Sequence, residues 1–148
     1  MINSTQITIT GNMGSDAELR YTPTGTAVVT FSVAVAQRKY DKESGKWADA
    51  GTTWYRVNAW RDLAEHCAES LTRGTRVIVM GALASREWSN ADKSGTSWEI
   101  TADAIGPELS YATATVRKTS RTSVPLPPDP YERDGQAGEP AETGSEPA

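Results

Sequence analysis

Alternation of apolar and polar residues predicts a chain built mainly from β-strands, because side chains along a strand point to opposite faces with a period of two. The alternation is clearest over residues 27–36, where three valines and a phenylalanine share one face and small or hydroxyl-bearing residues share the other. Residues 76–88 are apolar at first and then alternate, as expected of a strand that is buried at its start and projects at its far end. Strands are thus predicted over residues 6–10, 27–36, 53–61, 76–88 and 96–105.

Glycine, proline and polar residues mark the connections between these strands. Residues 11–14 break the first strand with two glycines, residues 22–25 form a turn, and residues 89–95 turn the last two strands into a hairpin. Residues 16–21 are ambiguous between strand and loop. The longest connection is expected over residues 37–51, as a hydrophilic and mobile hairpin loop.

A single helix is predicted between the third and fourth strands. Leu63, Cys67 and Leu71 recur every four residues, Asp62 can cap the first turn, and Gly74 stands where a glycine commonly ends a helix. A helix at this point in a series of five strands is the element order of the OB-fold, a five-stranded Greek-key barrel. We therefore predict an all-β protein with this fold, one α-helix between strands 3 and 4, and extended hairpin loops.

The strand over residues 53–61 has an unusual distribution of side chains. Trp54, Arg56 and Trp60 share one face with an asparagine, whereas the other face carries Val57, Ala59 and a tyrosine. Large rings that alternate with a guanidinium group suit stacking on unpaired bases, because every base has a π face and every nucleotide a phosphate. An ordinary strand with both faces buried is the alternative, and this stretch alone leaves both interpretations open.

The arginine and tryptophan spacing recurs in the fourth strand, where Arg86 and Trp88 share a face. Residues 37–51 add four cations around Tyr40 and Trp47. A basic loop with aromatic rings suits a clamp over a flexible polyanion, although most charged loops are only solvated, and this plainer explanation is stronger for Trp47 than for Tyr40. The loop cations are Arg38, Lys39, Lys42 and Lys46.

Charge divides the chain into two parts. Residues 1–118 carry 13 Lys and Arg against 13 Asp and Glu, whereas residues 119–148 carry 2 against 6 and account for the whole net charge of −4. The acidity of the chain therefore does not exclude a nucleic-acid partner, which needs only a local basic surface. Because the second part is rich in proline, glycine and glutamate, we predict one domain over residues 1–118 and a disordered acidic tail over residues 119–148.

Membrane, metal and enzyme functions are not indicated. No apolar run approaches the roughly 18 residues of a membrane span and the N-terminus has no signal-like region, so a cytoplasmic protein is expected. Cys67 is the only cysteine, which excludes an intrachain disulfide and a cysteine-cluster zinc site but leaves a disulfide to another subunit open. His66 is the only histidine, and no nucleophile or paired-carboxylate motif accompanies it. We expect no catalysis, no metal and no cofactor.

Several motifs occur in an order and spacing that point to one family. They are Ile9-Thr10-Gly11-Asn12-Met13-Gly14, Trp54-Tyr55-Arg56-Val57, Leu63-Ala64-Glu65 and Arg86-Glu87-Trp88. With these motifs the chain closely resembles the bacterial single-stranded DNA-binding protein family from about Gln6 to Ile105. The resemblance implies sequence-independent binding of single-stranded DNA in replication, repair or recombination, a homotetramer around which the DNA wraps, and association with the nucleoid. It further implies base stacking on Tyr40, Trp54, Trp60 and Trp88, and phosphate contacts from Arg38, Lys39, Lys42, Arg56, Arg61 and Arg86.

Two features towards the C-terminus bear on partners. Residues 109–116 resemble an additional strand of actinobacterial family members, which is expected to clamp neighbouring subunits. Typical members end in clustered aspartates and an apolar tip that recruits replication and repair proteins, whereas residues 142–148 hold scattered acids and no aromatic or aliphatic tip. We therefore expect recruitment through the tail to be weak or absent. The competing hypothesis is an OB-fold interaction module, or a binder of oligosaccharides or RNA that uses the same rings.

Overall fold

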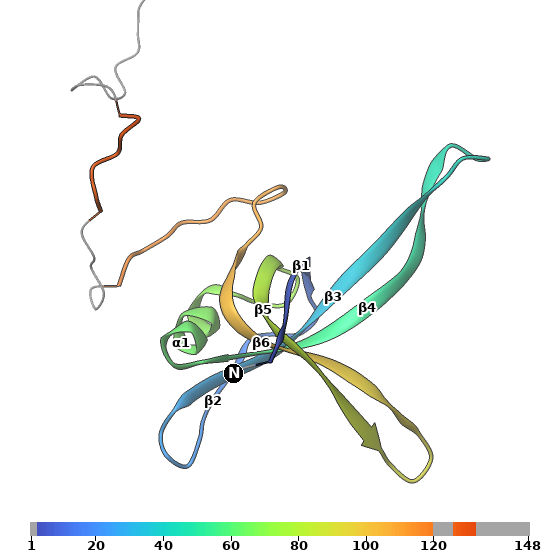
Figure 1. Ribbon diagram of the computed structural model, residues 1–148, viewed down its shortest axis with the longest axis horizontal. Helices are drawn as coiled ribbons and strands as arrows, with labels where there is room; N and C mark the ends of the chain where they lie inside the picture. The colour runs from blue at the N-terminus through green and yellow to red at the C-terminus, as the bar shows by residue number, and fades with distance from the viewer. Residues whose placement is uncertain (1–2, 120–125, 133–148) are drawn as a thin grey trace, which may run out of the picture. The chain divides into compact units, whose positions relative to one another are not determined.

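The strands form a barrel from which two long hairpins project (Figure 1). The computed structural model describes residues 3–119 and 126–132. The sheet has the order β1-β5-β6-β4-β3-β2, and an additional pairing of β1 with β3 closes it into a barrel. The elements are β1 (Thr5–Met13), β2 (Glu18–Tyr21), β3 (Ala27–Asp41), β4 (Lys46–Trp60), α1 (Arg61–Ser70), β5 (Arg76–Ser89) and β6 (Ser94–Pro107).

The number of strands differs from the prediction by one. The ambiguous residues 16–21 contain β2, which pairs antiparallel with β3. The helix therefore lies between β4 and β5, which correspond to the third and fourth predicted strands. The all-β barrel of OB type with one helix is confirmed. β2 was ambiguous because four residues are too few to establish an alternation.

The predicted hairpin over residues 37–51 is confirmed, but the prediction of a mobile loop is wrong. β3 continues to Asp41 and β4 begins at Lys46, so most of the segment is paired strand. Asp41 holds the short turn, because its carboxylate accepts hydrogen bonds from the Glu43 backbone N–H and the Ser44 hydroxyl, both at 3.0 Å. These hydrogen bonds, that from Glu43 first, lower the pKa of Asp41. The pairing could not be recognised in the sequence because an exposed two-stranded ribbon has no apolar face.

The helix begins and ends differently from the prediction. α1 follows β4 without a break, so that Trp60 and not Asp62 occupies the N-cap position. Arg61 makes the junction with a φ of 61°, a left-handed conformation that a residue with a side chain adopts at an energetic cost. Gly74 also has a positive φ, but it lies in the turn before β5, beyond the end of the helix.

The core lies between the inner faces of the strands and the apolar side of α1. Val29 of β3, Val57 of β4 and Ile100 of β6 are completely buried. Ala64 and Cys67 bring α1 into the same cluster. The apolar faces predicted for residues 27–36 and for the helix are therefore the ones that the fold buries.

Two glycines allow neighbouring strands to approach closely. A Cβ on Gly11 of β1 would overlap the backbone carbonyl of Ala34 in β3. A Cβ on Gly81 of β5 would overlap the backbone carbonyl of Thr101 in β6, next to a register shift in that strand pair. A side chain at either position would push two strands apart, so the close approach of β1 to β3 depends on Gly11 and that of β5 to β6 on Gly81.

Residues 109–116, predicted as an extra strand, form no strand in the single chain. The chain leaves β6 through an ion pair in which Arg76 Nε lies 2.6 Å from Glu108 Oε1. The Ser110 hydroxyl donates a hydrogen bond to Glu108 Oε2 at 2.6 Å, and this bond, followed by that from Arg76, lowers the pKa of Glu108. The Arg76 guanidinium also lies 5.8 Å from the centre of the Tyr111 ring. These contacts anchor the start of the segment to the barrel.

The chain divides into two units after Ala114. Most of the predicted tail, including its last residues 142–148, lies outside the described residues. The parts of it that are described, residue 119 and residues 126–132, contain no helix or strand. Over residues 3–119 and 126–132, no helix is both long enough and apolar enough to cross a membrane.

Cys67 is expected to resist thiol reagents in the folded protein. Its side chain is buried against the barrel, and burial raises the pKa of the thiol to about 11, so little reactive thiolate exists near neutral pH. Ellman's reagent should therefore react with the native protein only as it unfolds, and at once in denaturant. Rapid reaction of native protein would contradict this burial, and a disulfide-linked dimer on a non-reducing gel would establish the intersubunit bond.

Candidate nucleic-acid interface

β4 presents its large side chains outward, as predicted. Trp54 is 55% exposed and Trp60 is 41% exposed, and Arg56 is exposed between them. On the opposite face, Val57 and Ala59 are completely buried. The interpretation of this strand as one with both faces buried is therefore wrong.

The hairpin of β5 and β6 continues the same outer face. Arg56 of β4 pairs in register with Glu99 of β6, which in turn pairs with Ala84 of β5, so the three side chains point to one side. Farther along β5, Arg86 and Trp88 share that side, and Trp88 is exposed. We call this surface the aromatic face; it carries Trp54, Arg56, Trp60, Arg86 and Trp88.

Two of the rings on the aromatic face lie against glycines. A Cβ on Gly14, in the bend after β1, would lie 2.5 Å from Cζ3 of Trp54. A Cβ on Gly95, opposite Trp88 in the hairpin, would lie 2.8 Å from Cζ2 of Trp88. Only a residue without a side chain lets an indole pack this closely on the backbone. The backbone thus limits the movement of each ring, and the exposed remainder of each ring is what a flat ligand can meet.

The cations of the aromatic face surround a single carboxylate. Glu99 Oε2 lies 3.4 Å from Arg86 Nε, and Glu99 is also the register neighbour of Arg56. The Glu99 side chain is largely buried, whereas that of Arg86 is exposed. Arg61 lies apart from this group, at the junction of β4 and α1. Glu99 therefore orients Arg86 and offsets part of the positive charge on this face.

The outer part of the β3–β4 hairpin, residues 37–51, carries the other predicted residues, and we call it the arm. Arg38 Nε lies 3.7 Å from Asp49 Oδ1, and two such exposed groups gain little from pairing. Lys39 and Lys42 are exposed on the same segment. At about 3.3 Å per residue, β4 separates the tip of the arm from Arg61 by roughly 45 Å. The six predicted cations thus fall into two groups. Arg56, Arg86 and Arg61 lie on or near the aromatic face, whereas Arg38, Lys39 and Lys42 lie on the arm.

Two further residues are candidates for this surface. The sequence did not indicate Arg20, and for Trp47 it favoured a ring that is only solvated. Arg20 of β2 pairs with Val28 of β3, which pairs with Trp60, so Arg20 points to the same side as that ring. The sequence carries no signal for Arg20, because the faces of β2 could not be assigned. Trp47 of the arm is 61% exposed, and the only trace of its placement in the sequence is the glycine at position 51, which has a φ of 114° beside a shift in the strand register.

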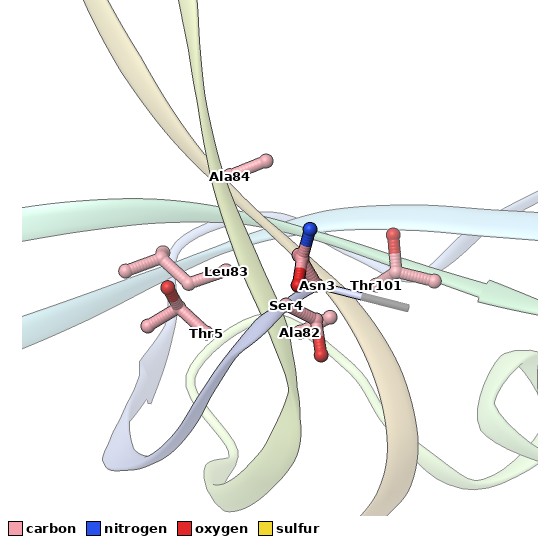
Figure 2. Close-up of a pocket in the computed structure, with 7 residues that line it drawn as sticks. All are labelled: Asn3, Ser4, Thr5, Ala82, Leu83, Ala84 and Thr101. Carbon is pink, nitrogen blue, oxygen red and sulfur yellow. The ribbon is translucent and has the colours of Figure 1, made fainter. Parts of the chain in front are cut away.

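A pocket of about 560 Å³ lies where the start of β1 passes β5 and β6 (Figure 2). Its lining is small and uncharged, with Thr5, Leu83 and Thr101 among the side chains drawn there. In the described part of the chain, no cluster of three or more His, Cys, Asp or Glu could hold a metal ion. His66 is exposed on α1, so it is a solvated side chain. The lining of the pocket contains no His, Cys, Asp, Glu, Lys or Arg.

The chain is similar to known proteins along most of its length. Residues 4–107 match the single-strand binding protein family. The single-stranded DNA-binding protein of Mycolicibacterium smegmatis is 48% identical over 82% of this chain and 74% of the relative, and that of Mycobacterium leprae is 50% identical over 82% and 73%. The crystal structure of a small single-stranded DNA-binding protein from Streptomyces coelicolor matches with a TM-score of 0.66 and 35% identity, covering 73% of this chain and 97% of that one. The family match spans every strand from β1 to β6, including both hairpins.

Proposed function

This chain belongs to the single-strand binding protein family, and we propose that it coats single-stranded DNA on the nucleoid during replication, repair and recombination, without catalysis and without selecting a sequence. The observation that carries the proposal is the aromatic face, where exposed rings alternate with guanidinium groups. Each stacked base contributes roughly 1–3 kcal/mol irrespective of its identity. Phosphate contacts add affinity that falls with salt, with a slope near −0.7 per neutralised phosphate on single strands.

Titration with fluorescein-labelled oligo-dT tests this function. Anisotropy should rise at low salt, and tryptophan emission should fall as bases cover the rings. Unlabelled oligo-dT should compete, whereas duplex DNA of equal length should not. Competition by glycans alone would support an oligosaccharide binder instead, and equal competition by oligo-U would show that a 2′-hydroxyl is accepted.

The chain is also proposed to assemble with copies of itself into a homotetramer. From Thr5 to Gly11, β1 pairs with β5, and its pairing with β3 is confined to Asn12 and Met13, so one edge remains available to another strand. Ile78 and Met80 of β5 expose large apolar side chains next to this edge. A mass measurement in solution should give four chains, and a monomer at micromolar concentration would contradict the assembly.

The segment that follows β6 is proposed to strengthen this assembly as an additional strand. Leu109 and Tyr111 are both well exposed in the single chain. Because Glu108 is anchored to Arg76, the segment starts from a defined point on the barrel. A strand without a partner in its own chain can form against the edge of a neighbouring sheet. Removal of residues 109–116 should therefore shift the assembly towards smaller species in the same mass measurement.

Gly14→Ala is expected to weaken binding of oligo-dT about fivefold or more, because the new methyl group displaces the Trp54 ring and impairs its stacking on a base. Thermal unfolding should change little, since the displaced atoms belong to an exposed side chain. The control is a double-mutant cycle: in a Trp54→Ala background, Gly14→Ala should have no further effect on affinity. An equal loss in both backgrounds would show that Gly14 acts independently of the ring.

Glu99→Gln is expected to tighten binding of oligo-dT at low salt, because Arg86 is released to a phosphate and a negative charge leaves the aromatic face. The salt dependence should become steeper by about 0.7, the value for one additional phosphate contact. Glu87→Gln is the matched control, since Glu87 lies next to Arg86 in β5 and points to the opposite side. Weaker binding by Glu99→Gln would mean that the carboxylate is needed to orient Arg86.

A further inference from the structure

A β-bulge in the arm brings Trp47 to the side that carries Trp54. The register of β3 and β4 shifts between Ala36 and Arg38, where β4 contains one residue more than β3. Gly51 lies in this interval, and its φ of 114° is a conformation that favours glycine. Without an extra residue, an odd-numbered side chain such as Trp47 would point away from the even-numbered Trp54. With it, both indoles lie on one side of β4.

Trp47 and Tyr40 form a pair of exposed rings near the tip of the arm. The two residues are register partners, and their ring centroids lie 5.4 Å apart with the planes at 63°. An edge-to-face pair stabilises a hairpin but leaves much of each ring face uncovered. Trp47 is in fact the most exposed of the five tryptophans, all of which lie in the described part of the chain.

The charges of the arm favour a polyanion that follows the ribbon. The arm carries four cations and three acids, but Asp41 is engaged in the turn and Asp49 is paired with Arg38. Lys39, Lys42 and the neighbouring Lys46 are exposed on the same ribbon. Lys39 and Lys46 are register partners of Ala48 and Asp41, so they point to the face opposite the rings, and Lys42 lies in the turn. The long side chains of these lysines can reach the phosphates of a strand that follows the edge of the ribbon.

We propose that Trp47 is a further base-stacking residue, paired with Tyr40, and that the arm lengthens the aromatic face so that one subunit contacts more nucleotides. This inference deepens the proposed function and depends on it. It assigns the bulge at Gly51 a role, which is to align the ring of the arm with the rings of the barrel. Trp98 provides the contrast, because it is also exposed but points to the side of the β5–β6 hairpin opposite Trp88.

Three single variants test the proposal by anisotropy with labelled oligo-dT. Trp47→Leu retains an apolar partner for Tyr40 but no flat ring, and it should weaken binding about fivefold to a hundredfold, the loss expected for one stacked base. Trp47→Tyr should restore most of the affinity. Trp98→Leu, the matched control, should bind like the parent protein. Binding by Trp47→Leu that equals the parent would overturn the proposal, because the ring would then serve only to pack the arm.

A double variant, Trp47→Ala with Ala48→Trp, moves the indole to the other face of the arm. It tests whether binding needs the ring on the side of Trp54 or only a tryptophan in the arm. Ala48 pairs with Lys39 and points to the other side of the arm, so the variant has the same composition of rings on the opposite face. It should bind as weakly as Trp47→Leu, and full affinity would contradict the role of the bulge. If the parent protein itself fails to bind oligo-dT, the proposed function fails; if it binds and only the Trp47 variants are unaffected, this inference alone fails.

Discussion

Replacing both Trp54 and Trp88 with alanine is expected to weaken binding of oligo-dT by about 30-fold to 20,000-fold, since two stacked bases at roughly 1–3 kcal/mol each are lost. Both indoles are exposed, and each packs closely on a glycine. No core residue is disturbed, because the buried side of β4 consists of other residues. Anisotropy with labelled oligo-dT gives the loss of affinity, and circular dichroism confirms that the barrel is retained.

The control for this double variant is Trp98→Ala, which removes an exposed indole from the opposite side of the β5–β6 hairpin. It should leave the affinity unchanged. The salt slope of the double variant should match that of the parent protein, because the rings contribute no charge. A double variant that binds as tightly as its parent would assign the affinity to phosphate contacts alone and would reject base stacking on these two residues.

Gly81→Ala is expected to lower the free energy of unfolding by about 2–3 kcal/mol or more, the cost of forcing a methyl group into a closely packed crossing. The added Cβ would overlap the backbone carbonyl of Thr101, which cannot rotate aside as a side chain can. Gly81 lies at the base of the β5–β6 hairpin. The substitution should therefore also shift Arg86 and Trp88, farther along β5, relative to the side chains of β4. Denaturant unfolding at a fixed protein concentration measures the loss.

Gly106→Ala serves as the control, because Gly106 lies in β6 opposite Ile78 and a Cβ there would meet nothing within 4 Å. Its stability should equal that of the parent protein or exceed it by up to about 1 kcal/mol through reduced freedom of the unfolded chain. Equal free energies of unfolding for Gly81→Ala and the parent would show that β5 and β6 can move apart near Gly81 without loss of stability.

The sequence predicted the elements of the barrel wherever a strand has one buried and one exposed face. Residues 27–36 and 53–61 alternate because the core requires Val29 and Val57 on one side only, and the orientation of Trp54 followed from the same alternation. The arm could not be predicted in this way, because both of its faces meet water and no apolar period marks it.

Three features could not be predicted because they depend on how strands join or pair: the first residue of α1, and the sides of the sheet to which Arg20 and Trp47 point. Asp62 has the chemistry of an N-cap, but α1 begins earlier because β4 runs directly into it through Arg61. Arg20 could not be placed until β2 was paired with β3. A simple alternation puts Trp47 on the wrong side of β4, since it does not count the extra residue of the bulge.

The glycines beside Trp54 and Trp88 bear on the entropy of the proposed binding. Each indole packs on the backbone at its glycine, and this contact restricts the rotamers of the ring before any ligand arrives. If these rings stack on bases as proposed, less side-chain entropy is lost when DNA binds, because immobilising a side chain costs about 0.5–1.5 kcal/mol.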